Sequence, residues 1–174
     1  MFLEIGDLKV VLPSDREIAL SRGFNAPRRM VFDAFTRADL VRRWLAGPPG
    51  WDFAVCDIDL SVGGSYHYVW RRQTDQAEAE MFGVFREIVP ERLVASEMTD
   101  DSLCAGRIFD TTVLVDHGAT TVLKLAALYE TREARDAILK SDMLKGMAAG
   151  YDRLAAFLAS IAPSPPRTLA NAAR

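Results

Sequence analysis

Hydrophobic and polar positions alternate between residues 51 and 129, which is the pattern of half-buried β-strands. Six segments there are rich in β-branched and aromatic residues, and turn signals such as Gly63-Gly64 separate them. Connections this short favour antiparallel neighbours, because a parallel crossover needs a dozen or more residues. The six predicted strands are Phe53–Leu60, Ser65–Arg72, Glu80–Val89, Leu93–Met98, Arg107–Val115 and Thr121–Tyr129.

The chain before Trp51 predicts one strand and two short helices. Residues 15–24 alternate roughly, as an edge or half-buried strand does. The sequence Asn25-Ala26-Pro27 then begins a short helix, with Asn25 as its expected cap and Pro27 in its first turn. A second short helix follows around Ala38–Leu45 and ends at the Gly-Pro-Pro-Gly sequence of residues 47–50.

The C-terminal third predicts one long helix. Thr131 is its expected cap, and the helix is expected to continue to about Ser160. A helix of this length spans roughly 40 Å, enough to cross a domain. Gly146 and Gly150 lie on or beside its apolar face, where close packing or room for a ligand would explain them. That face is formed by Met143, Met147, Tyr151, Leu154 and Leu158.

The order of the elements predicts an α+β fold in which one sheet face is buried against the long helix. We expect a curved antiparallel sheet of six to seven strands, with two short helices after the first strand. Residues 12–161 form a single domain in this scheme, and residues 1–11 are an N-terminal extension. Residues 162–174 hold three prolines and few large apolar groups, so we expect a disordered tail.

Short motifs occur in a fixed order over residues 12–160. Most of them mark turns, strand starts and packing positions rather than chemistry. They are Leu12-Pro-Ser-Asp-Arg-Glu-Ile18, Phe24-Asn-Ala-Pro27, Arg43-Trp44, Gly47-Pro-Pro-Gly-Trp51, Asp59-Leu-Ser-Val-Gly-Gly-Ser-Tyr66, Gly83-Val-Phe-Arg-Glu-Ile-Val-Pro-Glu-Arg-Leu-Val94 and Gly150-Tyr-Asp-Arg-Leu154.

In this order and spacing the motifs resemble the SRPBCC superfamily, also called START-like. Within it, the chain is most similar to the AHSA-type branch, the homologues of the activator of the heat-shock chaperone ATPase. The resemblance implies a helix-grip fold, in which the sheet wraps around the C-terminal helix. It implies no single function, because members range from ligand carriers to cyclase-like enzymes and co-chaperones.

Composition and charge narrow the class of partner. The net charge is -3, and the last 14 residues carry two arginines and no acid, so the remainder has 19 basic against 24 acidic residues. A mildly acidic domain without a Lys/Arg cluster is a poor candidate for nucleic acid or an anionic membrane. No apolar run reaches the roughly 20 residues of a membrane span, and residues 1–12 lack a signal-peptide layout. We therefore expect a cytoplasmic protein.

The reactive side chains form no recognisable catalytic or metal motif. Cys56 and Cys104 are far apart, so two buried thiols are expected rather than a disulfide. His67 and His117 are the two histidines and do not form a metal-ligand pattern. No nucleophile elbow, P-loop or dinucleotide fingerprint occurs. We expect neither a metal nor a cofactor.

An aromatic and methionine set is the candidate binding site. Alternating positions on two predicted strands share a face, and the long helix contributes its own apolar residues. If both faces are concave, they enclose an apolar pocket with a few hydroxyls; otherwise the same side chains simply fill the core. Two tryptophans flank the Gly-Pro-Pro-Gly loop, which we interpret as a rim or lid. The predicted ligand-binding residues are Trp44, Trp51, Tyr66, Tyr68, Trp70, Met81, Phe85, Met143, Met147 and Tyr151.

Three functions follow from this set. The first is binding of a small hydrophobic or amphipathic molecule without covalent chemistry. The second is a cyclase- or dehydratase-like enzyme for a polyketide-like or aromatic substrate, with Glu87 or Glu97 as acid or base if either is buried. Arg86 and Arg107 are the alternative partners that would make these glutamates structural. The third is a co-chaperone-type interaction domain, and a homodimer is left open.

Overall fold

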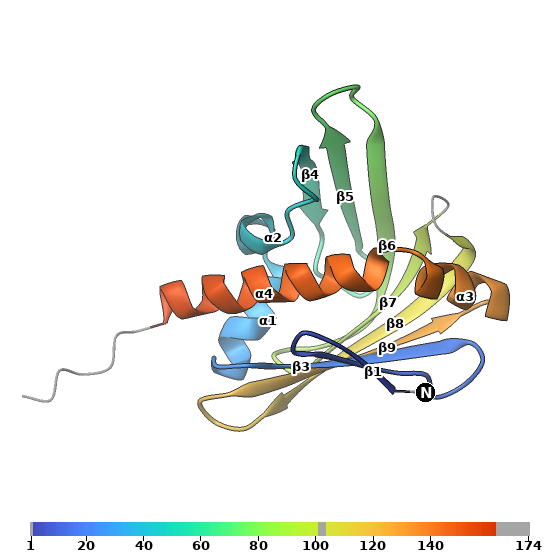
Figure 1. The fold of residues 1–174 in the computed structure, drawn as a ribbon. Helices are drawn as coiled ribbons and strands as arrows, with labels where there is room; N and C mark the ends of the chain where they lie inside the picture. The colour runs from blue at the N-terminus through green and yellow to red at the C-terminus, as the bar shows by residue number, and fades with distance from the viewer. Residues whose placement is uncertain (1, 101–103, 163–174) are drawn as a thin grey trace, which may run out of the picture.

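The structure, a computed structural model, describes residues 2–100 and 104–162. Within these ranges the side chains of residues 93, 95, 99, 100, 104 and 105 are not described. The described chain forms nine strands and four helices (Figure 1). Their order is β1 (Phe2–Ile5), β2 (Leu8–Val11), β3 (Glu17–Phe24), α1 (Arg28–Thr36), α2 (Ala38–Trp44), β4 (Trp51–Ile58), β5 (Ser65–Arg72), β6 (Glu78–Val89), β7 (Leu93–Asp100), β8 (Cys104–Asp116), β9 (Thr121–Tyr129), α3 (Arg132–Lys140) and α4 (Met143–Ile161).

All nine described strands belong to one sheet, in the order β1-β2-β3-β9-β8-β7-β6-β5-β4, and every neighbouring pair is antiparallel. Figure 1 shows the sheet curving around α4, with β3 and β9 along one side of the helix and β4 and β5 standing steeply to it. This confirms the expected α+β helix-grip fold, including the two short helices after β3. The long concave face is the surface on which a ligand site can be built.

The sheet is wider than expected because residues 2–11 add two strands to it. Leu8 and Val10 are buried and Lys9 between them is exposed, so this short segment already alternates as a strand does. Gly6 adopts a positive φ of 58° in the turn between β1 and β2. The segment treated as an extension in the sequence analysis is therefore continuous with the domain's sheet.

The expectation of one helix from Thr131 to Ser160 is wrong, because the chain forms two helices there. Thr131 does cap the first, and its Oγ1 accepts a hydrogen bond from the Ala134 amide at 3.1 Å. Ser141 is extended, with ψ 174°, and its Oγ accepts from the Met143 amide at 3.1 Å. A serine in this conformation competes with the helix and starts a new one. The 19 residues of α4 thus span about 28 Å rather than 40 Å.

A second correction concerns the start of α1. Asn25 does not cap this helix, which begins at Arg28 with Pro27 in the capping position and no side-chain cap bond. Pro27 still contributes its carbonyl, which accepts from the amides of Met30 and Val31. The expected disorder after residue 161 falls mostly on residues 163–174, outside the described residues. No described helix has the length and hydropathy needed to cross a membrane.

Helix α4 is hydrogen-bonded to the C-terminal end of α2 and to the loop that follows it. Arg153 donates from Nε to the Trp44 carbonyl at 2.9 Å and from Nη2 to the Ala46 carbonyl at 2.8 Å. The Trp44 indole donates in turn to the Ala34 carbonyl at 2.8 Å. Gly150 lies beside this indole, where an added Cβ would come within 3.9 Å of the ring, whereas Gly146 faces open space. An approach of 3.9 Å is an ordinary van der Waals contact, so close packing against α2 does not require glycine at either position.

Candidate functional site

The strand register aligns three inward side chains at the centre of the concave face. Phe85 of β6 pairs with Ser96 of β7, and Ser96 pairs with Asp110 of β8. Phe85 and Ser96 are buried, whereas the next residue of β7, Glu97, ion-pairs with Arg86 on the other face. Because neighbouring residues of a strand point to opposite faces, this row faces α4.

Asp110 is an acid placed in an apolar interior. Burial raises its pKa from 3.8 to about 7. Its side chain nevertheless keeps part of its surface accessible. Across the described chain, no hydrogen bond or ion pair reaches its carboxyl oxygens. A carboxyl group that is enclosed, accessible and unpartnered is free to interact with a bound molecule.

Two tyrosines lie close enough to sense the charge of Asp110. Burial, followed by the Asp110 charge, raises the pKa of both Tyr66 of β5 and Tyr151 of α4. The Ser96 side chain lowers the pKa of the Tyr66 hydroxyl and so partly opposes the effect of burial. The Tyr151 hydroxyl makes no hydrogen bond within the described residues and keeps some accessible surface. The site therefore combines one acid with two tyrosine hydroxyls.

Aromatic rings surround the Tyr151 end of the site. The Tyr151 ring centroid lies 6.1 Å from that of Phe24, 6.0 Å from Phe35 and 6.2 Å from Trp44. On the sheet side, the Tyr66 and Phe85 rings lie 5.5 Å apart. These rings make the surroundings of Asp110 apolar on the helix side and on the sheet side, which accounts for its raised pKa.

Several side chains on the inner face are not fully covered by α4. The backbone of this helix lies closest to α1, α2, α3 and β1, and not to β5, β6 or β7. The interior divides into two buried clusters, bridged by the partly buried residues Leu45, Ile88 and Val94. Some inner-face side chains near these clusters therefore keep part of their surface accessible. The partly exposed inner residues include Met81, Val94, Met98, Thr112, Met143 and Met147.

The predicted ligand-binding residues fall into two adjacent groups and one outlier. Tyr66, Tyr68, Trp70, Met81 and Phe85 belong to the cluster of β4, β5 and β6. Trp44, Met143, Met147 and Tyr151 belong to the larger cluster around α4. Trp51 belongs to neither and lies under the Arg72 guanidinium, 5.1 Å from its ring.

The Trp70 side chain contacts the loop between α2 and β4 and holds it in place. Its indole donates to the Leu45 carbonyl at 3.0 Å, and its ring stacks on Phe53 at 5.0 Å and 8°. An added Cβ at Gly47 would come within 3.0 Å of the Trp70 ring. The loop of residues 45–50 is thus anchored on the sheet.

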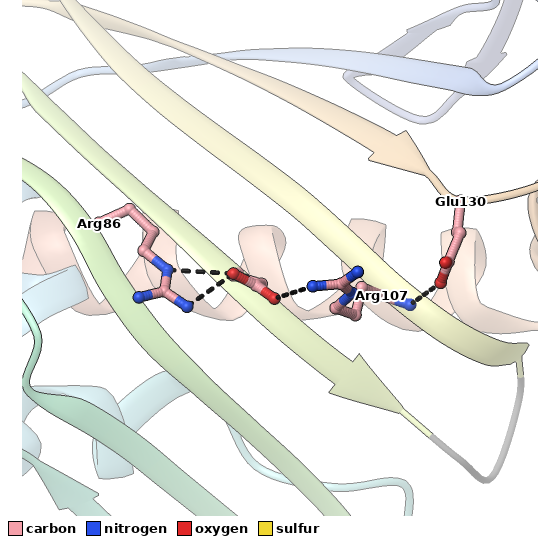
Figure 2. Close-up of polar contacts among 4 residues, drawn as sticks. Arg86, Arg107 and Glu130 are labelled. Atoms are coloured by element: carbon pink, nitrogen blue, oxygen red, sulfur yellow. Dashed lines mark hydrogen bonds and ion pairs between the residues drawn. The ribbon is translucent and has the colours of Figure 1, made fainter.

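The two glutamates proposed as acid or base lie outside the concave face. Glu97 Oε2 accepts from Arg86 Nε at 3.0 Å and Nη2 at 2.7 Å, and Glu97 Oε1 accepts from Arg107 Nη1 at 3.3 Å. Figure 2 shows this network on the side of the sheet away from α4, with Glu130 accepting from the Arg107 backbone amide. The Arg86 hydrogen bond lowers the pKa of Glu97. Glu87 is exposed, and Glu97 is partly exposed.

Replacing Glu97 by glutamine should therefore leave ligand binding unchanged. The substitution removes a charge from an outer-face ion pair and does not reach the inner face. Titration of a fluorescent apolar dye into both proteins checks this, and a clear loss of affinity in Glu97→Gln would place Glu97 at the site after all.

Sequence reasoning missed Asp110, Ser96 and Thr112. A signal was present, because Ile108, Asp110, Thr112 and Leu114 alternate on one face of a predicted strand. A carboxylate at the centre of an otherwise inward face is the unusual member of that series. Cys56 is a buried free thiol, and the thiol of Cys104 lies outside the described side chains.

The described surface also carries two open hollows. One of about 580 Å³ lies between α2 and α4 and is lined by Arg42, Arg43, Arg153, Ala156 and Phe157. The other, of about 430 Å³, lies beside β4 and the start of α2 and includes His67. Within the described residues, no three His, Cys, Asp or Glu side chains gather as metal ligands would.

Comparisons with known proteins agree with this architecture. A solved structure of a Rhodobacter sphaeroides protein matches with a TM-score of 0.82 and 25% identity, over 88% of this chain and 99% of that one. Protein CV1439 of Chromobacterium violaceum gives 0.71 and 23%, over 83% and 98%. Protein Ms6760 of Mycobacterium smegmatis gives 0.73 and 15%, over 91% and 97%. No curated protein matches the chain.

The family comparison covers most of the chain. Residues 25–159 match the family described as Activator of Hsp90 ATPase homolog 1-like protein. This confirms the resemblance drawn from the ordered turn and strand motifs. The chain belongs to the Activator of Hsp90 ATPase homolog 1-like family, with the helix-grip fold.

Proposed function

We propose that the protein binds a small, mostly apolar or amphipathic molecule between the concave sheet face and α4, without covalent chemistry. The observation that carries this proposal is the Asp110 carboxyl, which is enclosed yet accessible and has no partner in the described chain. A polar group left in this state destabilises an empty protein. A bound molecule that meets it converts this cost into affinity and specificity.

The surroundings of Asp110 support an apolar ligand body. Met81, Met98, Met143 and Met147 are partly exposed on the inner side of the fold. Methionine is flexible and polarizable, so such walls adapt to the shape of a guest. A mainly apolar lining with a few convergent polar groups is the usual composition of a small-molecule site. Membership of a helix-grip family, whose general role is ligand binding, supports the same function.

Proton transfer is the second candidate function, and Asp110 is the observation that favours it. A carboxyl group with a pKa of about 7 can both donate and accept a proton at neutral pH. The enzyme alternative thus moves from Glu87 and Glu97 to Asp110, with the Tyr151 hydroxyl beside it. Binding remains the function supported best, because it requires only the contacts already described.

The direct test is native mass spectrometry of freshly purified protein, followed by denaturing extraction of any bound compound. We expect an apolar or amphipathic molecule at near-stoichiometric occupancy. The same protein should bind the neutral dye Nile red with a blue-shifted emission.

The substitution Val94→Phe distinguishes a ligand-binding space from a filled core. Val94 touches both buried clusters, so the larger ring would enter the space between them. We expect this variant to lose Nile red binding while its stability changes by less than about 1 kcal/mol, since the ring fills existing space. In a close-packed core the same change would cost about 1 to 3 kcal/mol.

The matched control is Val84→Phe, the same substitution at a position paired with Glu97 on the outer face. It should bind Nile red as the unmodified protein does. A destabilised Val94→Phe that still binds the dye, together with an empty protein on extraction, would reject the proposed function.

A further inference from the structure

The Asp110 carboxyl faces the proposed ligand space without any positive charge to balance it. Burial is the cause of its raised pKa, and no arginine or lysine counteracts it. The buried guanidinium of Arg22 is paired through Nη2 alone, at 2.9 Å from Asp152 and 3.3 Å from Asp7, and its Nε and Nη1 have no hydrogen-bond partner in the described chain. Arg22 pairs with Leu123 of β9, four residues along that strand from Ala127, the register partner of Asp110. The charge that would balance an ionised Asp110 must therefore come from the ligand or from a proton.

Among the described side chains of β5, β6, β7, β9 and α4, the groups on the inner face beside Asp110 are uncharged at neutral pH. They are Ser96 of β7, Phe85 of β6, Tyr66 of β5, Ala127 of β9 and Tyr151 of α4. Glu97, which follows Ser96 in the sequence, pairs with Arg107 on the outer face. Among these described neighbours, no charged group therefore competes with a ligand for the carboxyl.

The aromatic rings of the site favour a cationic ligand over an anionic one. The face of an aromatic ring attracts a cation and repels an anion. Tyr66 and Phe85 lie on the sheet side, and Tyr151 lies on the helix side with Trp44 next to it. A carboxylate in aromatic surroundings is a combination that recognises an ammonium group.

The tyrosine hydroxyls are arranged as acceptors for the same group. The Tyr66 hydroxyl lies near Ser96, and the Tyr151 hydroxyl makes no hydrogen bond in the described chain. An ammonium carries up to three N–H donors, which the Asp110 oxygens and the Tyr151 oxygen can accept. A ligand carboxylate would instead meet a like charge.

We propose that the site takes a small amphipathic amine, whose ammonium group pairs with Asp110 and whose apolar part lies against the methionines of α4. This inference rests on the proposed function and names the ligand class. Its apolar part matches the partly exposed Met143 and Met147. The protein's net charge of -3 also favours a cationic ligand over an anionic one.

The test compares decylamine, decanol and decanoate as competitors of Nile red at pH 8. The three probes share a chain and differ in the head group. Decylamine should bind at least about tenfold more tightly than decanol, and decanoate should bind most weakly. Asp110→Asn should bind amine and alcohol equally, with decanol affinity and the circular dichroism spectrum retained. Tyr151→Phe should lose several-fold of the amine preference.

Asp15→Asn is the matched control, because Asp15 is exposed and makes no described interaction. It carries the same chemical change and should keep the full amine preference.

The pH dependence gives an independent readout. Asp110 has a pKa of about 7, so its ionised fraction rises from about one tenth at pH 6 to about nine tenths at pH 8. A primary amine stays protonated over this range. Decylamine affinity should therefore rise about tenfold from pH 6 to pH 8, whereas decanol affinity should stay constant.

Equal binding of decylamine and decanol, unchanged in Asp110→Asn, would overturn this inference and leave the proposed function standing. Tighter binding of decanoate at pH 6 than of decylamine at pH 8 would also overturn it, because Asp110 would then act as a hydrogen-bond donor. Failure of Nile red and all three probes to bind would reject the ligand site itself.

Discussion

Asp110→Asn should be more stable than the unmodified protein at pH 8. The folded state holds the Asp110 proton up to a pKa of about 7, whereas an unfolded carboxyl loses it near 3.8. Unfolding therefore releases a proton between about pH 4 and pH 7, and stability falls as the pH rises through this interval. Asparagine keeps the shape of the side chain and has no proton to lose.

The size of the effect follows from the pKa difference. A change from 3.8 to about 7 corresponds to about 4 kcal/mol at 1.36 kcal/mol per pKa unit. Asp110 keeps some accessible surface, so water relieves part of this cost, and we expect about 2 kcal/mol. Urea unfolding at pH 4, 5, 6, 7 and 8 measures it. The two proteins should be nearly equal at pH 4 and diverge up to pH 8.

Asp15→Asn again serves as the control and should follow the unmodified protein at every pH. If Asp110→Asn were less stable at pH 8, the carboxylate would have a favourable partner in the folded state. That result would remove the physical basis of the ligand site.

A stabilising Asp110→Asn would mark the acid as a functional residue. Natural proteins retain destabilising groups where a site requires them, and the cost recurs at binding and catalytic positions. The same substitution should then improve stability and abolish amine preference, which a purely structural role would not combine.

The architecture followed from local patterns in the sequence. The spacing from Phe53 to Tyr129 is too short for parallel crossovers, so the antiparallel order was determined by loop length alone. The break at Ser141 was missed because the apolar stripe from Met143 to Leu158 suits a longer helix equally well. Only the local hydrogen bond from the Met143 amide to Ser141 shows where the new helix starts.

The site was harder to predict than the fold, because its residues differ from their neighbours in the face of the strand on which they lie. Glu97 and Ser96 are neighbours, yet one lies on the outer face with two arginines and the other beside Asp110. The bulge between Phe85 and Glu87 shifts the register of β6 by one residue. Across such a bulge, the alternation of inward and outward positions shifts by one residue. Counting alternate residues along the sequence therefore could not place Glu87 on the correct face.

The outer face has an apolar surface that the sequence pattern did not reveal. Phe109 and Leu128 are register partners on β8 and β9 and are 42% and 37% exposed. They come from segments 19 positions apart, so no continuous run marks them. Only the pairing of strands brings them together.

Gly83→Ala should destabilise the protein by about 2 to 3 kcal/mol, the second large effect that we expect. The Tyr66 ring lies directly over Gly83 on the neighbouring strand, and an added Cβ would overlap the ring and its hydroxyl. Tyr66 would have to move, which disturbs its contact with Phe85 and its position next to Ser96.

The control for Gly83→Ala is Gly23→Ala in β3, where an added Cβ would meet nothing within 4 Å. This second change should alter stability by less than about 0.5 kcal/mol. A double-mutant cycle with Tyr66→Ala isolates the cause, because Gly83→Ala should cost little once the ring is absent. An equal cost in both backgrounds would show that Tyr66 is not what Gly83 accommodates. If the cycle gives the expected coupling, Gly83 is the position that lets Tyr66 lie flat beside Asp110, and the amine preference should fall in Gly83→Ala together with stability.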